Sequence, residues 1–110
     1  MERRLSDLAE LESRAEHVAT RLAEAANARR LLILCSLARA QKEGTGEMSV
    51  GAMQAVVGLS QSALSQHLSR LRTAGMVAAR RDGQNVLYRL ADEETRALMA
   101  ALYDTFCATD

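Results

Sequence analysis

Two cysteines, Cys35 and Cys107, are the residues of this chain whose type and spacing favour redox chemistry. They lie 72 positions apart in a chain of 110 residues that contains no third cysteine. Each one alone is typical of a small buried hydrophobic residue. As a pair, in segments that we expect to pack together, they predict a reversible dithiol. A cytosolic protein does not keep a structural disulfide, so a bridge between them is expected to be transient and sensory.

A second set of residues favours contact with nucleic acid. The stretch from Leu59 to Met76 contains no acidic residue, and short hydroxyl and amide side chains follow one of its faces. Such groups form hydrogen bonds to base edges in a major groove, while arginines hold phosphates. The predicted DNA-contacting residues are Gln61, Ser62, Ser65, Gln66, His67, Ser69, Arg70, Arg80, Arg81 and Gln84. We expect His67 to be a structural or phosphate-contacting group rather than a metal ligand.

Helical periodicity indicates the outer elements that frame these residues. Apolar side chains at spacings of three and four predict a helix over residues 4–25 with a narrow stripe, the kind that packs on another helix or across a dimer interface. The stripe consists of Leu5, Leu8, Leu11, Ala15, Val18 and Leu22. A last helix, capped by Asp92, is expected over residues 92–107, and both end helices are interpreted as dimerisation helices.

The central elements are bounded by capping residues. Asn27 is expected to cap a second helix, whose inner face should carry Leu31, Leu34, Cys35 and Ala38. Ser49 and Ser60 are expected to cap two short helices joined by a turn that contains glycine. Two short helices so connected predict a helix-turn-helix over residues 49–74.

The hydrophobic period changes to two after the helix-turn-helix. Alternating residues flank Asp82-Gly83-Gln84, which predicts a β-hairpin wing over residues 76–90 with positive φ angles at Asp-Gly. The predicted fold is mainly α with a small β-hairpin wing. Its order is helix, helix, helix-turn-helix, hairpin and helix, in one winged-helix domain over residues 1–110.

Composition narrows the function classes. The chain is 48% hydrophobic with no proline and no net charge, which excludes a disordered polyelectrolyte. The neutrality hides an asymmetry, because residues 60–90 carry five arginines against one acid, whereas residues 91–110 carry one arginine against five acids. The sequence has no membrane span and its charged start is unlike a signal peptide, so we expect a cytoplasmic protein. No phosphate loop or Ser/His/Asp arrangement indicates an enzyme or a cofactor.

The motifs resemble a known family. VGLSQSALSQHLSRLRTAGMV followed by ARRDGQNVLYRL is similar to the ArsR/SmtB-type dimeric bacterial repressors, and residues 27–34 resemble their second helix. The resemblance covers about residues 20–106. It implies a homodimer joined by its first and last helices, which binds an inverted-repeat operator and is released by an inducer. Ser62 stands where many members have proline, which the start of a helix also tolerates.

The resemblance also implies a class of inducer. The BigR/SqrR-like subgroup, which responds to sulfide or persulfide, carries one cysteine in the second helix and one in the last, and Cys35 and Cys107 match these positions. The implied chemistry is attack of a thiolate on a persulfide or polysulfide, followed by resolution through the second thiol. Peroxide would use the same pair through a sulfenic acid.

Other functions stay open at this point. A metal-responsive repressor is one alternative, but Ser49 and Gly51 occupy positions where soft-metal members need thiolates, and the last helix contains no histidine. His17 and His67 are the only histidines, and neither has ligand spacing with a second donor. A metal site that joins Cys35, Cys107 and a histidine across subunits also stays open. Two further alternatives are a DNA-binding protein without an effector and a winged helix used only for protein contacts.

Overall fold

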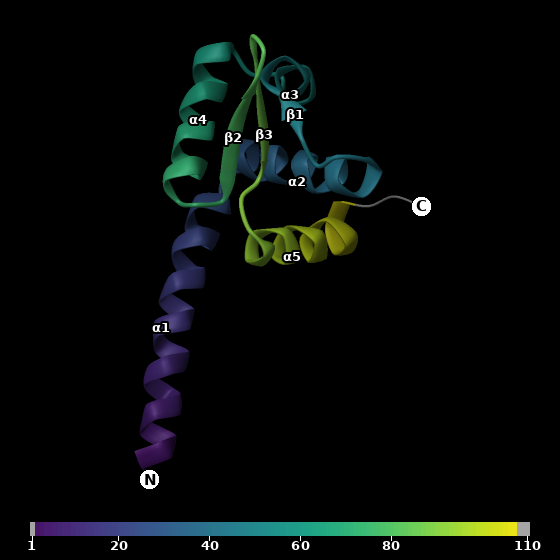
Figure 1. Ribbon diagram of the computed structural model, residues 1–110. Coiled ribbons are helices and arrows are strands. Elements are labelled where there is room, and N and C mark those ends of the chain that lie inside the picture. Colours follow the sequence, from purple (N-terminus) through teal and green to yellow (C-terminus); the bar gives the residue numbers. More distant parts are fainter. Residues whose placement is uncertain (1, 108–110) are drawn as a thin grey trace.

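The computed structural model describes residues 2–107, with side chains from residue 7 onward. Met1, residues 108–110 and the side chain of Leu5 lie outside the described part. The elements in order are α1 (Glu2–Ala25), α2 (Ala28–Glu43), β1 (Met48–Ser49), α3 (Val50–Val57), α4 (Gln61–Thr73), β2 (Val77–Asp82), β3 (Asn85–Leu90), α5 (Glu93–Leu102) and the π-helical η1 (Tyr103–Cys107). This order confirms the predicted winged helix-turn-helix fold, mainly α with a hairpin wing (Figure 1).

Each predicted helix cap forms in the structure. The Asn27 side chain accepts hydrogen bonds from the backbone N–H groups of the first turn of α2. Ser49, Ser60 and Asp92 do the same at the starts of α3, α4 and α5. These side chains satisfy backbone donors that a helix start leaves without partners, which explains why the helices begin at these positions.

The wing is part of a three-stranded antiparallel sheet with the strand order β1-β3-β2. The short strand β1, which pairs Met48 with Tyr88, was not expected from the sequence. The hairpin turn is Gly83-Gln84, one residue later than predicted, because Asp82 still pairs with Asn85 in the ladder. Only Gly83 in this turn has a positive φ, +64°, a conformation that favours glycine.

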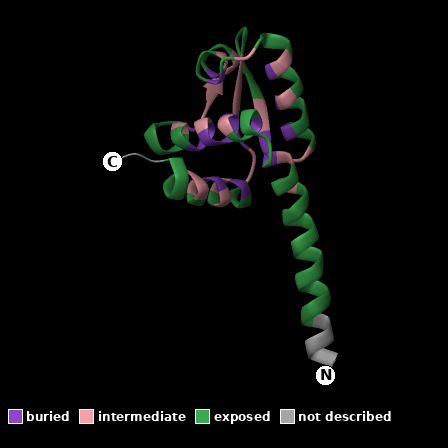
Figure 2. Ribbon diagram, turned by 180° about the vertical axis from the view of Figure 1, so that it is seen from behind, coloured by how far each residue is buried: buried purple, intermediate pink, exposed green. Residues whose placement is uncertain are grey.

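The core lies where α2 crosses beneath the helix-turn-helix and the sheet (Figure 2). The predicted inner residues of α4, namely Leu64, Leu68 and Leu71, are buried there. The prediction for α2 is partly wrong: Leu31 is 36% exposed, whereas Ile33 and Leu37 are fully buried. Ile33 and Leu37 face the cluster of buried residues, whereas Leu31 faces solvent.

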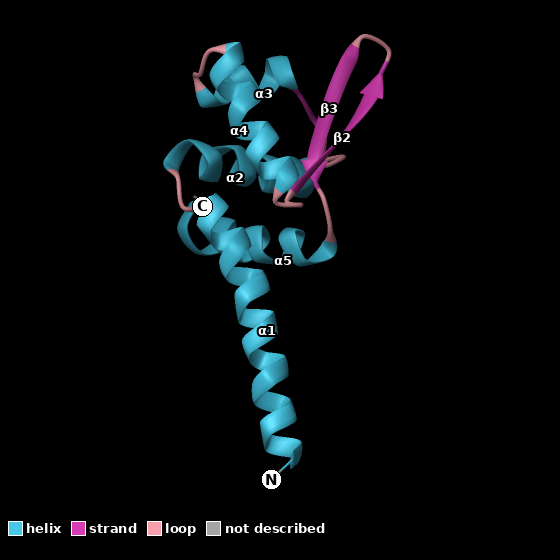
Figure 3. Cartoon of the chain, turned by 90° about the vertical axis from the view of Figure 1, so that its left-hand side faces the viewer, coloured by secondary structure: helices cyan, strands magenta, loops and turns pink. Residues whose placement is uncertain are grey.

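Helix α1 extends away from the rest of the chain as a long arm (Figure 3). Leu8, Leu11, Val18 and Leu22 of the predicted stripe are all exposed on it, the first two by 57% and 64%. The base of the arm is tied to α5, because Arg21 donates two hydrogen bonds of 3.0 and 3.1 Å to the Asp92 carboxylate. The arm thus presents an apolar stripe that its own subunit leaves uncovered.

The end of the chain departs from the prediction of one regular helix to residue 107. Its last five described residues, Tyr103–Cys107, form a π-helical turn, in which hydrogen bonds link residues five apart rather than four. Apolar spacing does not distinguish the two kinds of turn, so the sequence could not indicate this change. Within residues 2–107, no helix combines the length and the apolar character that crossing a membrane requires.

Candidate functional site

The two cysteines come together where η1 packs against α2. The Sγ atoms of Cys35 and Cys107 lie 3.7 Å apart, and both residues are free thiols. This distance is a non-bonded contact, because the two sulfurs of a disulfide are about 2.05 Å apart. The expectation that the second and last helices bring the two cysteines close is confirmed.

The two thiols differ in their surroundings. Cys35 is buried, with 7% of its surface exposed, whereas Cys107 is exposed. Burial, together with the hydrogen bond and charge of the neighbouring Cys107, raises the pKa of the Cys35 thiol to about 11. Since only the thiolate is nucleophilic, we expect Cys35 to react slowly at neutral pH, and Cys107 is the thiol that solvent reaches in the single subunit.

A lysine at the end of α2 holds the segment that carries Cys107. Lys42 forms an ion pair with Asp104, and its ammonium lies 5.5 Å from the ring centroid of Tyr103. Both contacts are on η1, within one turn of Cys107. They fix the π-helical segment against the helix that carries Cys35.

The helix that carries Cys35 also contacts the helix-turn-helix. Arg29 at the start of α2 donates a hydrogen bond of 3.1 Å to the carbonyl of Val57 at the end of α3. Arg30 is buried, donates to the carbonyl of Glu24, and lies 3.4 Å from Nδ1 of His67 in α4. Burial and the nearby charges of Arg30 and Arg70 lower the pKa of His67. His67 is therefore half-buried between helices rather than on the open face of α4.

The other polar residues singled out on α4 lie on its exposed side. That side carries Gln61, Ser62, Ser65, Gln66, Ser69 and Arg70. Gln61 also lines a groove of about 300 Å³ between the starts of α3 and α4 and the wing tip, and Gln84 lines its other side. The fold thus brings together two predicted residues that are 23 positions apart in the sequence.

Two of the predicted arginines form ion pairs with glutamates that were not predicted from the sequence. Arg70 donates two hydrogen bonds of 3.1 Å to Glu24, and Arg80 donates bonds of 2.6 and 2.8 Å to Glu47. These pairs lower the pKa of both glutamates. Arg81 at the wing is exposed and forms no ion pair with any residue of the described part. No local sequence signal indicates either pair, because the partners lie on different elements.

The described residues also bear on a metal site. Among residues 2–107, no group of three or more histidine, cysteine, aspartate or glutamate side chains is arranged to hold a metal ion. The sulfur pair therefore stands as two thiols without a third donor from the described part of the same subunit.

Comparison with known proteins places this geometry in a family. Residues 27–79 match the model of the arsR family of bacterial regulatory proteins. A biofilm growth-associated repressor of Agrobacterium fabrum is 41% identical over 100 residues, which cover 91% of this chain and 80% of the repressor. Among solved structures, reduced HlyU from Vibrio cholerae has a TM-score of 0.80 at 39% identity, covering 90% of this chain and 98% of that one.

A further solved structure is described as a homodimer. The homodimeric winged helix-turn-helix DNA-binding domain of Mb0332 from Mycobacterium bovis has a TM-score of 0.70 at 33% identity and covers 84% of this chain and 81% of that one. The winged helix-turn-helix fold is shared with these solved structures, and the similarities cover 84–91% of this chain. The protein belongs to the arsR family of bacterial transcriptional regulators.

Proposed function

We propose that this protein is a cytoplasmic repressor that binds an inverted-repeat operator as a homodimer and is released when Cys35 and Cys107 react with a persulfide or polysulfide. The observation that carries the proposal is the 3.7 Å contact between two free thiols from segments 72 positions apart. One thiol is exposed and the other is buried beside it. This arrangement suits capture of an electrophile followed by resolution within one subunit.

The DNA contacts follow from the exposed side of α4 and from the wing. Gln61, Ser62, Ser65, Gln66 and Ser69 are proposed to face base edges and phosphates in the major groove. Arg70, Arg81 and Gln84 are proposed to lie along the DNA backbone, Arg70 only after it leaves Glu24. Arg80 stays paired with Glu47 at the wing. His67 acts through its contact with Arg30 and orients α4, because its ring is half-buried.

The homodimer is supported by the uncovered stripe on α1. Its leucines have no cover within the subunit, and exposed apolar stripes of this kind mark protein interfaces. The homodimeric Mycobacterium bovis domain shares the fold. We propose that α1 and α5 join two subunits, so that two copies of α4 reach successive major grooves about 34 Å apart.

The sulfur chemistry has two steps. The Cys107 thiolate attacks the outer sulfur of a low-molecular-weight persulfide, RSSH, and expels the thiol RSH, which leaves a persulfide on Cys107. Cys35 then loses its proton and attacks Sγ of Cys107, which forms the disulfide and releases hydrogen sulfide. The two thiols lose two electrons and the transferred sulfur gains them. The short distance between the thiols offsets the high pKa of Cys35 in the second step.

The bridge affects DNA binding because it joins two different parts of the regulator. Cys35 lies on α2, which contacts α3 and α4, whereas Cys107 follows α5, which Asp92 and Arg21 connect to α1. A bond that pulls the sulfurs from 3.7 Å to about 2.05 Å shifts the helix-turn-helix relative to the dimerisation helices. An inverted repeat is sensitive to that shift, because both half-sites must fit at once.

The test uses an operator selected from random duplexes by the reduced protein. Fluorescence anisotropy then follows its release when glutathione persulfide is added. The wild type is expected to leave the DNA and to rebind after dithiothreitol, whereas Cys35→Ser and Cys107→Ser stay bound. The proposal fails if either serine variant is released as readily as the wild type.

The same assay separates the other functions. Release by hydrogen peroxide at equal doses, with no preference for persulfide, indicates a general peroxide sensor that uses the same thiols. Release by zinc from the reduced protein indicates metal sensing. A protein that binds DNA and responds to none of these reagents is a regulator without an effector, and salt-independent retention of DNA argues against phosphate contacts.

A further inference from the structure

The two faces of the wing carry different arginines. Side chains alternate along a strand, so neighbouring arginines Arg80 and Arg81 point to opposite faces of the sheet. Arg81 shares its face with Val77, which is buried in the core together with the inner residues of α4. Arg80 lies on the outer face, where its ladder partner is Leu87 and the partner of Leu87 in β1 is Ser49.

A carboxylate occupies the outer face. Glu47 precedes β1, and Arg80 reaches it across the central strand β3 through two hydrogen bonds. The Glu47 side chain is 17% exposed and that of Arg80 is 50% exposed, so the carboxylate lies beneath the guanidinium. The charge of Arg89 on β3 also favours the ionised form of Glu47. Glu47 is therefore hydrogen-bonded to Arg80, while Arg89, which lies farther from the hairpin turn opposite Ala78, acts on it through its charge.

We propose that Glu47 sets the phosphate affinity of the wing, because its carboxylate neutralises Arg80 and leaves Arg81 as the phosphate-binding arginine. The inference rests on the proposed DNA binding and adds a residue that limits it. A phosphate that approaches Arg80 meets a guanidinium whose Nε–H and one Nη–H are already donated, and it meets the negative charge of Glu47 nearby. Within the described part of the chain, Arg81 donates no hydrogen bond to a carboxylate and forms no ion pair.

The physical consequence is a limit on binding that does not depend on base sequence. Each phosphate that a protein neutralises adds about 0.9 to the slope of the logarithm of affinity against the logarithm of salt. A neutral Arg80–Glu47 pair contributes little to that slope. Replacing Glu47 with glutamine keeps the size and one acceptor oxygen, removes the charge, and frees Arg80 to bind one more phosphate.

The test measures binding of the reduced, full-length protein to a fluorescein-labelled duplex of random sequence at several salt concentrations. Because the dimer carries the substitution in both subunits, Glu47→Gln is expected to steepen the salt slope by about 1.8 and to tighten binding about 60-fold near 0.1 M salt. Arg81→Ala is expected to weaken binding by a similar factor, and Arg80→Ala is expected to change it less than about two-fold. In the double variant with Glu47→Gln and Arg80→Ala, the gain is expected to disappear.

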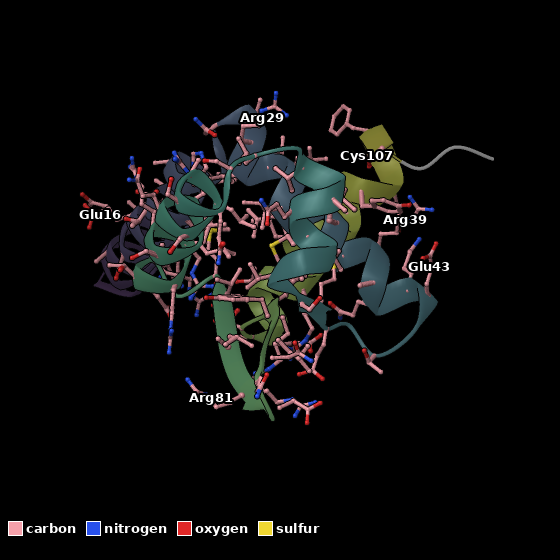
Figure 4. All side chains as sticks on the ribbon, turned by 90° about the horizontal axis from the view of Figure 1, so that it is seen from above. Glu16, Arg29, Arg39, Glu43, Arg81 and Cys107 are labelled. Carbon is pink, nitrogen blue, oxygen red and sulfur yellow. The ribbon has the colours of Figure 1, made fainter. Side chains whose placement is uncertain are left out.

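Glu43→Gln is the matched control. Glu43 also forms an ion pair with an arginine, Arg39, at 3.0 Å, but both residues lie in the last turns of α2, well apart from Arg81 (Figure 4). This variant should bind as the wild type does. Thermal melting checks that each variant is folded.

Three outcomes overturn the inference: Glu47→Gln binds no more tightly than wild type, its gain persists without Arg80, or Arg80→Ala weakens binding as much as Arg81→Ala. The two arginine variants provide the test even if Glu47→Gln is unstable. A wild-type protein that binds no duplex contradicts the proposed function itself, which is a separate result.

Discussion

Sγ of Cys107 lies 3.7 Å from Sγ of Cys35, but the first thiol is exposed and the second is buried. This asymmetry assigns an order of reaction to the two thiols. We expect the exposed thiol of Cys107 to react with the reagent first and the buried thiol of Cys35 to react second. Because η1 is held by Lys42 on α2, the contact belongs to the reduced protein before any reagent arrives.

The asymmetry predicts the order of alkylation. Iodoacetamide should modify Cys107 first, since the pKa of Cys35 is raised from 9.0 to about 11 and its thiolate is about 100-fold scarcer than that of an ordinary thiol near pH 8. Peptide mass spectrometry over time measures both rates. The rate at Cys35 should rise as the pH approaches 11, and Cys107→Ser should leave Cys35 slow. Equal rates at both cysteines in the native protein would contradict this order.

Gln66 should contribute to sequence recognition. A good bidentate amide-to-base contact discriminates between bases by about 1–3 kcal/mol, so Gln66→Ala should weaken binding to the selected operator by about ten-fold or more. Binding to a random duplex should change little, because phosphate contacts remain. Anisotropy titrations with both duplexes measure the two effects. An equal loss on both duplexes would mean that Gln66 contacts the backbone or supports the fold.

The stripe on α1 predicts a subunit contact. Leu11→Glu places a charge at a position that is 64% exposed in the single subunit and apolar in the stripe. We expect it to shift the protein from dimer to monomer in sedimentation velocity at micromolar concentration. Ser13→Glu is the control, because two residues along a helix turn the side chain by about 200°, away from the stripe. If both variants sediment as wild type does, the stripe is not the dimer contact.

The tie between α1 and α5 predicts a dependence of stability on pH. Hydrogen bonds from Arg21 and from the backbone of Thr95 hold the pKa of Asp92 far below its ordinary value of 3.8. Because the pKa of Asp92 is lower in the folded protein than in the unfolded chain, its ionised form stabilises the fold at pH values above the unfolded pKa. This contribution is lost as the pH falls from the unfolded pKa toward the folded pKa.

Asp92→Asn retains a capping oxygen but removes the charge. We expect it to reduce the free energy of unfolding by about 1 kcal/mol at pH 7, a modest value because the site is partly exposed. Urea unfolding at several pH values should show this difference narrowing as the pH drops below about 4. A difference that stays constant into strong acid would show that the charge of Asp92 is not its cause.

Local features of the structure were predictable from the sequence and long-range pairings were not. Asn27, Ser49, Ser60 and Asp92 marked helix starts because a cap depends on residues two or three positions away. The two-residue strand β1 is too short for alternation to reveal. The exposure of Leu31 to solvent depends on how the neighbouring helices pack around α2.

The candidate site divides in the same way. The polar face of α4 followed from helical periodicity, and the proximity of Cys35 to Cys107 followed from the expected packing of two helices. The pairs of Arg70 with Glu24 and Arg80 with Glu47 join residues 46 and 33 positions apart. Their formation depends on the angle between elements, which composition and spacing do not specify. The sequence therefore indicated which arginines face solvent without showing that two of them are already neutralised.

The most direct test of the dithiol switch combines intact mass spectrometry with DNA release in one sample. After limited glutathione persulfide, we expect a subunit that has lost two hydrogens, has gained no sulfur and carries no free thiol when alkylated. The bridged fraction should equal the fraction released from the operator, and dithiothreitol should reverse both. Release from DNA while both thiols of each subunit can still be alkylated would contradict the account.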